Sequence, residues 1–187
     1  MTEREELYTG LSHAAWGYFF LIIDFNLGPV SILPRFVGWL LALSAIGKLS
    51  GQRRELGLLR PLVIMMIAWS GADWLASWLG GSVEGHILPL DMLATVAALY
   101  FHFQFLTDLA ALAEKYQPGE SDLDRRLLRH RTAYTLLFTV FTLAGEMSQA
   151  IPWDGWEWTI LGEGIAGVVI ALLIMANLFE LRRCFRQ

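Results

Sequence analysis

Residues Leu143 to Leu178 read LAGEMSQAIPWDGWEWTILGEGIAGVVIALLIMANL, in which one apolar run ends, a short turn follows and a second apolar run begins. A helix needs about 20 mostly apolar residues to cross about 30 Å of hydrocarbon. The turn from Pro152 to Trp158 carries Asp154 and Glu157 but neither Lys nor Arg. The stretch therefore predicts two membrane-spanning helices joined by a tight hairpin.

The rest of the chain repeats this pattern. Of its 187 residues, 55% are hydrophobic and 17% charged, whereas a soluble domain has about 25% charged residues. We expect one all-α integral membrane domain over residues 1–187, with six transmembrane helices in three hairpins. The second span is short, so it is either tilted or partly inserted. The predicted spans are 10–28, 34–49, 61–79, 88–113, 132–151 and 159–181.

The basic residues lie almost entirely on one side of these spans. Thirteen of the 14 Lys and Arg residues fall in the two long connections and the two terminal segments, and Arg35 is the exception. The positive-inside rule then places both termini in the cytoplasm of a multi-pass protein of the cell membrane. The basic loops indicate orientation and contact with the lipid bilayer rather than a nucleic-acid interface.

Each predicted span carries one ionisable residue in its outer half. Such groups cost several kcal/mol in lipid, so they normally face the bundle interior or water. Six of them at similar depth predict a polar chamber open to the outside. They are Asp24, Arg35, Asp73, Asp91, Glu146 and Glu163.

Helical periodicity adds other polar residues to this set. Asp91, Thr95 and His102 share a face of the fourth span, because residues three and four apart lie on one side of a helix. The fifth span has a polar stripe of Thr135, Thr139, Thr142, Glu146 and Gln149. Each of these residues also has a structural explanation. Ser and Thr hydroxyls pack helices together, and a lone His often bonds a neighbouring helix.

Most tryptophans also map to the outer half. They form either an interfacial aromatic belt or a cover for the chamber, where flat rings attract cations. Trp74, Trp153 and Trp156 are the candidates for a cover.

Motifs for several familiar chemistries are absent. The chain has no HExxH, GxSxG, Walker A or Rossmann glycine pattern, so we assign no catalytic residue and no metal ligand. The cofactor stays unknown. A pair of the carboxylates is the remaining route to an intramembrane enzyme.

Two resemblances bear on the class of protein. The segment LIIDFNLGPVSILPRFVGWLL, Leu21 to Leu41, resembles one found in uncharacterised small multi-pass membrane proteins of Gram-positive bacteria. The overall plan is similar to the substrate-binding subunits of energy-coupling-factor transporters, which implies a partner membrane subunit or ATPase. Those subunits often have an Ala-x-x-x-Ala surface in the first helix. The nearest feature here is Ala14, Ala15 and Gly17.

The sequence leaves three functions open. The first is binding or transport of a small cationic or zwitterionic solute at an outward-facing acidic site, because five acids face one Arg. The second is a non-catalytic accessory or sensor subunit of a membrane complex, and the third is the intramembrane enzyme.

Overall fold

A computed structural model describes residues 3–22, 26–27, 30–31, 34–79, 81, 83, 88–119, 121–150 and 155–185. This part of the chain is all-helical apart from two paired strands of two residues each. Its elements are α1 (Glu3–Ile22), β1 (Asn26–Leu27), β2 (Val30–Ser31), α2 (Arg35–Leu49), α3 (Arg54–Leu58), α4 (Arg60–Trp78), α5 (Leu88–Tyr116), α6 (Leu123–Ala150) and α7 (Trp156–Arg183).

Six of these helices correspond to the predicted spans, with corrections to the first and the fifth. α1 begins at Glu3 rather than at residue 10. The first span was expected to continue as helix to residue 28, but α1 ends at Ile22 and Asn26–Leu27 pairs with Val30–Ser31. The sequence signal for this is the Asn-Leu-Gly-Pro run from Asn26 to Pro29, because Asn, Gly and Pro favour turns. The helix of the fifth predicted span is α6, which begins at Leu123 rather than at residue 132. Its charged first turns are helical as well as its apolar part. The short helix α3 was not expected.

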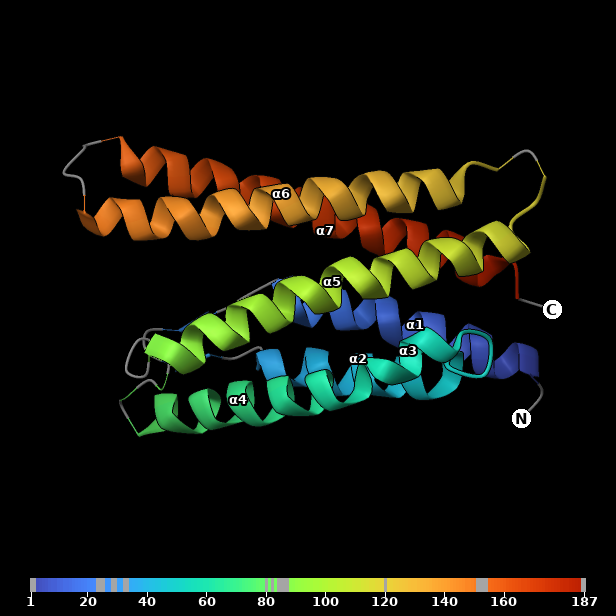
Figure 1. Ribbon diagram of the computed structural model, residues 1–187, viewed down its shortest axis with the longest axis horizontal. Coiled ribbons are helices and arrows are strands. Elements are labelled where there is room, and N and C mark those ends of the chain that lie inside the picture. The colour runs from blue at the N-terminus through green and yellow to red at the C-terminus, as the bar shows by residue number, and fades with distance from the viewer. Residues whose placement is uncertain are drawn as a thin grey trace.

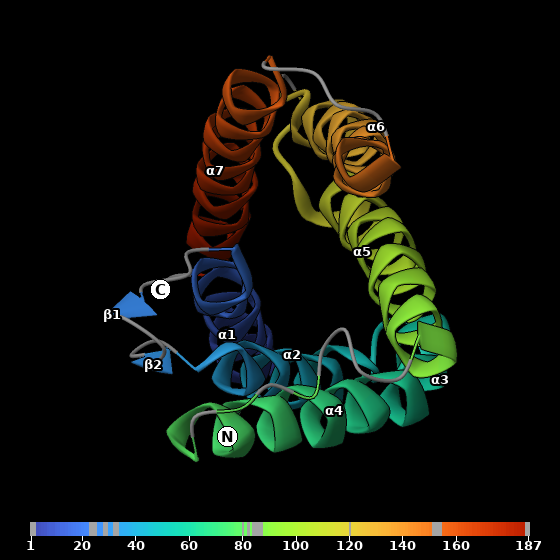
Figure 2. The same ribbon diagram turned by 90° about the vertical axis from the view of Figure 1, so that its left-hand side faces the viewer.

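The six long helices form a closed ring. Going round it, α1 packs on α2, α2 on α4, α4 on α5, α5 on α6, α6 on α7 and α7 on α1. The end-on view shows this ring directly (Figure 2). α1 begins and α7 ends at the same end of the bundle, which we call the terminal end (Figure 1). The opposite end is the distal end.

Glycines set the closest helix contact in the ring. A Cβ added to Gly38 of α2 would lie 2.7 Å from Leu21 Cγ and 3.0 Å from the Gly17 carbonyl oxygen of α1. A Cβ added to Gly10 would lie 2.9 Å from Leu49. Small residues let two helix backbones approach closely, so α1 and α2 form a tight pair.

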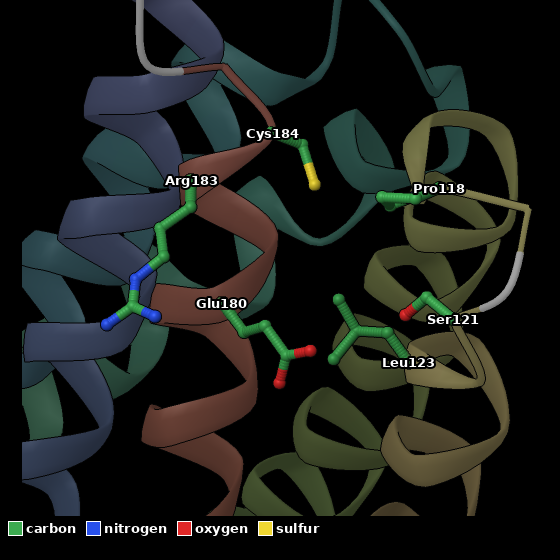
Figure 3. Close-up of a pocket in the computed structure, with 6 residues that line it drawn as sticks. All are labelled: Pro118, Ser121, Leu123, Glu180, Arg183 and Cys184. Atoms are coloured by element: carbon green, nitrogen blue, oxygen red, sulfur yellow. The ribbon is translucent and has the colours of Figure 1, made fainter.

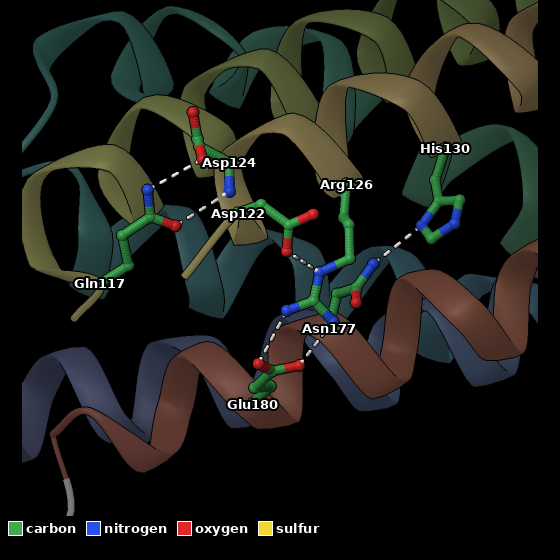
Figure 4. Close-up of polar contacts among 7 residues, drawn as sticks. All are labelled: Gln117, Asp122, Asp124, Arg126, His130, Asn177 and Glu180. Atoms are coloured by element: carbon green, nitrogen blue, oxygen red, sulfur yellow. Dashed lines mark hydrogen bonds and ion pairs between the residues drawn. The ribbon is translucent and has the colours of Figure 1, made fainter. Parts of the chain in front are cut away.

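Polar side chains join α5, α6 and α7 near the terminal end (Figure 4). The Arg126 guanidinium donates two hydrogen bonds to Glu180 of α7, at 3.0 and 2.9 Å, and lies 2.9 Å from Asp122. Gln117 bonds both the side chain and the backbone N–H of Asp124, and this contact lowers the pKa of Asp124. These contacts hold the α5–α6 turn and α7 in register.

His130 of α6 forms a further link, with its Nδ1 atom 2.8 Å from Asn177 Nδ2 of α7. Burial, then the charges of Arg129 and Arg126, lower the pKa of His130. The folded state therefore binds fewer protons at this residue than the unfolded state, whose pKa is near 6.5. Stability from this site is complete above that value and is lost as pH falls below it.

We expect the melting temperature to fall as the pH drops below about 6.5, the ordinary His pKa, because the unfolded chain then takes up the proton first. His130→Gln keeps a neutral hydrogen-bonding group and should flatten this slope. Thermal unfolding of both proteins across this pH range measures it. Equal slopes would contradict the assignment to His130.

Two helices among the described residues, Pro89–Tyr116 and Trp156–Arg183, are long and apolar enough to cross a membrane by length and composition. The apolar window of α7 is mostly exposed on the outside of the bundle, and that of α5 is about half buried. Exposed large apolar side chains also occur on α4 and α6, including Ile64, Leu75, Leu136 and Val140.

Candidate functional site

A cavity of about 690 Å³ lies inside the helix ring, and we call it the distal cavity. Its lining comes from α1, α2, α4, α5, α6 and α7, the six helices that form the ring. The lining residues belong to the last turn of α1, the first turns of α2, the first half of α5, the second to fourth turns of α7 and the middle of α4 and α6. The cavity therefore extends from the middle of the bundle toward its distal end.

Three charged residues from the predicted set line this cavity. Arg35 is the first residue of α2, Asp91 lies in the first turn of α5, and Glu163 lies two turns into α7. Glu163 Oε2 is buried and has no hydrogen-bond partner among the described residues. One cation and two anions thus face a single space.

α5 contributes a continuous polar face. Asp91, Thr95 and His102 all line the distal cavity, as their spacing predicted. Ala94 and Ala98 lie between them on the same wall and leave room beside the polar groups.

Aromatic rings make the inner boundary of the cavity. The His102 ring centroid lies 4.8 Å from that of Tyr134 and 5.9 Å from that of Trp39. His102 Nδ1 is 3.4 Å from the Tyr18 hydroxyl, which comes from α1. His102 is buried, so it both faces the cavity and ties three other helices to α5. The sequence left open whether His102 faces a ligand or bonds a neighbouring helix, and its position in the structure is compatible with both.

α6 faces the cavity with aromatic rather than hydroxyl side chains. Tyr134, Phe138 and Phe141 line it at helical spacing. The predicted Thr stripe does not: the Thr139 hydroxyl donates to the Thr135 carbonyl at 2.8 Å. The structural explanation, a hydroxyl satisfied by its own helix, holds for Thr139. Thr135, Thr139 and Thr142 are not among the residues that line the cavity.

Thr142 behaves in the same way, since its hydroxyl donates to the Phe138 carbonyl at 2.9 Å. Glu146 and Gln149 lie in α6, but their side chains are outside the described residues.

Arg35 lies deeper in the bundle than the sequence suggested. We expected it at the outer boundary, but α2 begins well inside the distal end, short of α4, α6 and α7 (Figure 1). The charge of Arg35 acts on Tyr134, a residue of the aromatic boundary. The reason is length: the 15 residues of α2 span about 22 Å, too short to reach across the bundle.

Three other predicted site residues that the structure describes are not part of the cavity lining. Asp73 Oδ1 accepts a hydrogen bond from the Val83 N–H at 2.8 Å, so it fixes the turn after α4. The Trp74 ring packs edge-on against Phe36 and Trp78. Trp156 is half-buried at the start of α7. Asp24 and Trp153 lie outside the described residues.

The aromatic side chains that line the cavity were not predicted from the sequence. Trp69 of α4 and the three rings of α6 line the cavity, yet none was a candidate. A usable signal was present, because Tyr134, Phe138 and Phe141 recur at helical spacing. In an apolar segment, that pattern also fits a stripe that faces lipid. The candidates were therefore chosen among polar residues.

Below the distal cavity the interior is filled by buried side chains, among them Phe105, Leu106 and Leu109. The carboxylate of Asp108, buried in the same half, lies 3.2 Å from Gln104 Nε2 and 4.0 Å from Arg53 Nη2. Nearer the terminal end, Gln52 Oε1 accepts hydrogen bonds from Lys115 Nζ and the Tyr116 hydroxyl, both at 2.7 Å. Packing and polar links therefore close the terminal half.

A second, smaller hollow of about 320 Å³ lies at the terminal end (Figure 3). The Cys184 sulfur points toward Pro118, and the Arg183 guanidinium points away from Glu180 (Figure 3). Glu180 is already engaged by Arg126. None of the predicted site residues lines this hollow.

Comparison of the chain with protein-family models, curated proteins and solved structures finds no match. Function is therefore argued from the distal cavity itself.

Proposed function

We propose that this protein crosses the cell membrane as a six-helix bundle and binds, or carries, a small cationic or zwitterionic solute in the distal cavity. Both termini then lie in the cytoplasm and the cavity faces outward. The observation that carries the proposal is a single cavity, inside a ring of apolar helices, that brings Arg35, Asp91 and Glu163 together.

The outer surface of the bundle supports the membrane setting. Apolar side chains such as Leu136 and Val140 on α6, and Ile165 and Leu172 on α7, are exposed. The 28 residues of α7 extend about 42 Å, enough for the bilayer core and one interface. Exposed Trp158 lies near the distal end, where an interfacial belt would place it.

The size and lining of the cavity support a small-molecule ligand. Sites for such ligands usually measure about 300–1,000 Å³ and combine apolar walls with a few polar groups. The distal cavity has this composition at about 690 Å³. Two carboxylates against one guanidinium favour a solute with at least one positive charge, because buried charges must be paired.

The relation to energy-coupling-factor subunits rests on the plan of the bundle. In this chain Ala14 and Ala15 are buried, and Gly17 contacts α2. These residues are therefore occupied by packing within the chain. A partner membrane subunit or ATPase would have to use another surface, and purification from native membranes would show such a partner directly.

Removing one cavity charge tests the proposal. We expect choline, butylamine or 4-aminobutyrate to raise the melting temperature of the detergent-purified protein, with no effect of glucose or butyrate. Glu163→Gln should weaken this binding about 10-fold or more, since a hydrogen bond to a charged group contributes about 1.5–3 kcal/mol.

The matched control is Glu157→Gln, the same change on the same helix at an exposed residue outside the cavity. It should bind as the unmodified protein does. Stabilisation by none of the positively charged compounds, or equal losses in both variants, would contradict the proposed function.

A further inference from the structure

We infer that the cation bound in the distal cavity is a quaternary ammonium group, such as trimethylammonium, held against aromatic rings and attracted by the charge of Glu163. This inference rests on the proposed function and names the chemical class of the cation. A quaternary ammonium has no N–H group, so aromatic faces and a nearby negative charge are enough to bind it.

Four rings that line the cavity follow one another from α6 across α5 to α2, and we call them the aromatic wall. The Phe138 ring centroid lies 6.1 Å from that of Tyr134, and the Tyr134 centroid lies 4.8 Å from that of His102. The His102 centroid lies 5.9 Å from that of Trp39. All four residues line the distal cavity, so the aromatic wall is a continuous surface on one space.

Two further rings reach the same cavity. Phe141 lies three residues after Phe138, on the same face of α6, and Trp69 comes from α4. Four of the six helices of the ring therefore present aromatic side chains to the cavity. The quadrupole of an aromatic ring attracts a cation that lies within about 6 Å of the centroid over its face.

Glu163 supplies negative charge to the same space. Arg35 and Asp91 also line the cavity, but each already interacts with another group of the chain. Glu163 Oε2 is buried and has no hydrogen-bond partner among the described residues. A buried charge needs a charge of opposite sign, and attraction between charges is stronger in a low-dielectric interior than in water.

The remaining lining favours a quaternary ammonium over a primary one. A primary ammonium brings three N–H donors, and each needs an acceptor once it leaves water. Outside the aromatic rings, however, most of the lining is apolar and includes Leu21, Leu137 and Val168. The charge of a quaternary ammonium is covered by methyl groups, which pack against such side chains without losing hydrogen bonds.

Three compounds of similar size test the inference on the full-length protein in a non-ionic detergent, by ligand-induced thermal shift. Ethanolamine has N–H groups where choline has methyl groups, and 3,3-dimethylbutan-1-ol has the shape of choline without its charge. We expect choline to bind at least about 10-fold more tightly than either, because cation–π attraction needs the charge and the lining favours the methyl groups.

Phe141→Leu and Phe138→Leu each remove a ring and keep an apolar side chain. Each should weaken choline binding about 5-fold and leave the binding of 3,3-dimethylbutan-1-ol nearly unchanged. The matched control is Phe103→Leu, which removes an exposed ring of α5 outside the cavity lining and should preserve the preference for choline.

Ethanolamine or 3,3-dimethylbutan-1-ol binding as tightly as choline would overturn the inference, while binding of amines would leave the proposed function standing. Binding of no cation at all would overturn both. Phosphocholine lipids carry the same trimethylammonium group. Choline binding more tightly than glycerophosphocholine would assign the site to a free cation, and the reverse order would assign it to a lipid headgroup.

Discussion

Gly38→Val is expected to lower the melting temperature of the protein by about 2–12 °C. A Cβ at this residue would meet Leu21 Cγ at 2.7 Å and the Gly17 carbonyl oxygen at 3.0 Å. The second contact is with backbone, which cannot rotate away. α1 and α2 must therefore separate, and overpacking of this kind costs about 1–3 kcal/mol.

The matched control is Gly71→Val in α4. A Cβ at Gly71 meets nothing within 4 Å, so the only expected change there is a small gain in helix propensity. Thermal unfolding of the two variants in the same detergent makes the comparison. Equal melting temperatures would show that the α1–α2 contact is looser than the glycines indicate.

The same contact connects stability to the site. Leu21 lines the distal cavity and is also the side chain nearest to Gly38. Separation of α1 from α2 would move Leu21 and the start of α2, which carries Arg35. We therefore attribute the position of Arg35 to the packing of these two helices.

The helices themselves were predictable because membrane-length apolar runs leave few alternatives. The sequence also predicted which segments share an end of the bundle: α3 and the α5–α6 connection lie at the terminal end, where α1 begins and α7 ends (Figure 1). The end of α1 at Ile22 was not predictable from the sequence. The apolar run continues past this residue, and the strand pair depends on local backbone geometry.

The site was predictable only in part. Arg35, Asp91, Glu163 and His102 line one cavity, and spacing along α5 placed two of them on a common face. The depth of Arg35 was missed, since depth depends on how far α2 reaches. Hydropathy alone does not define that length.

The α6 face was missed for a different reason. Thr135, Thr139 and Thr142 form a regular stripe, but the Thr139 and Thr142 hydroxyls bond carbonyls of their own helix, so their direction carries little information. Tyr134 is the α6 residue that the packing places against His102. Which face of a helix turns inward depends on all its neighbours, and these are known only from the assembled ring.

Cysteine accessibility in intact cells tests the central claim, that a membrane-embedded ring encloses a cavity open to the outside. Cys184 is the only cysteine in the sequence, so a Cys184→Ser background gives a clean readout. Thr95→Cys places a thiol on the cavity wall, and Thr139→Cys places one on the exposed exterior of α6.

We expect an impermeant methanethiosulfonate reagent carrying a quaternary ammonium group to label Thr95→Cys in intact cells. Thr139→Cys should stay unlabelled, because lipid prevents the thiolate from forming there. Cys184 of the unmodified protein should react only after the cells are permeabilised. Labelling of Thr139→Cys as readily as Thr95→Cys, or of Cys184 in intact cells, would contradict the membrane ring and its orientation.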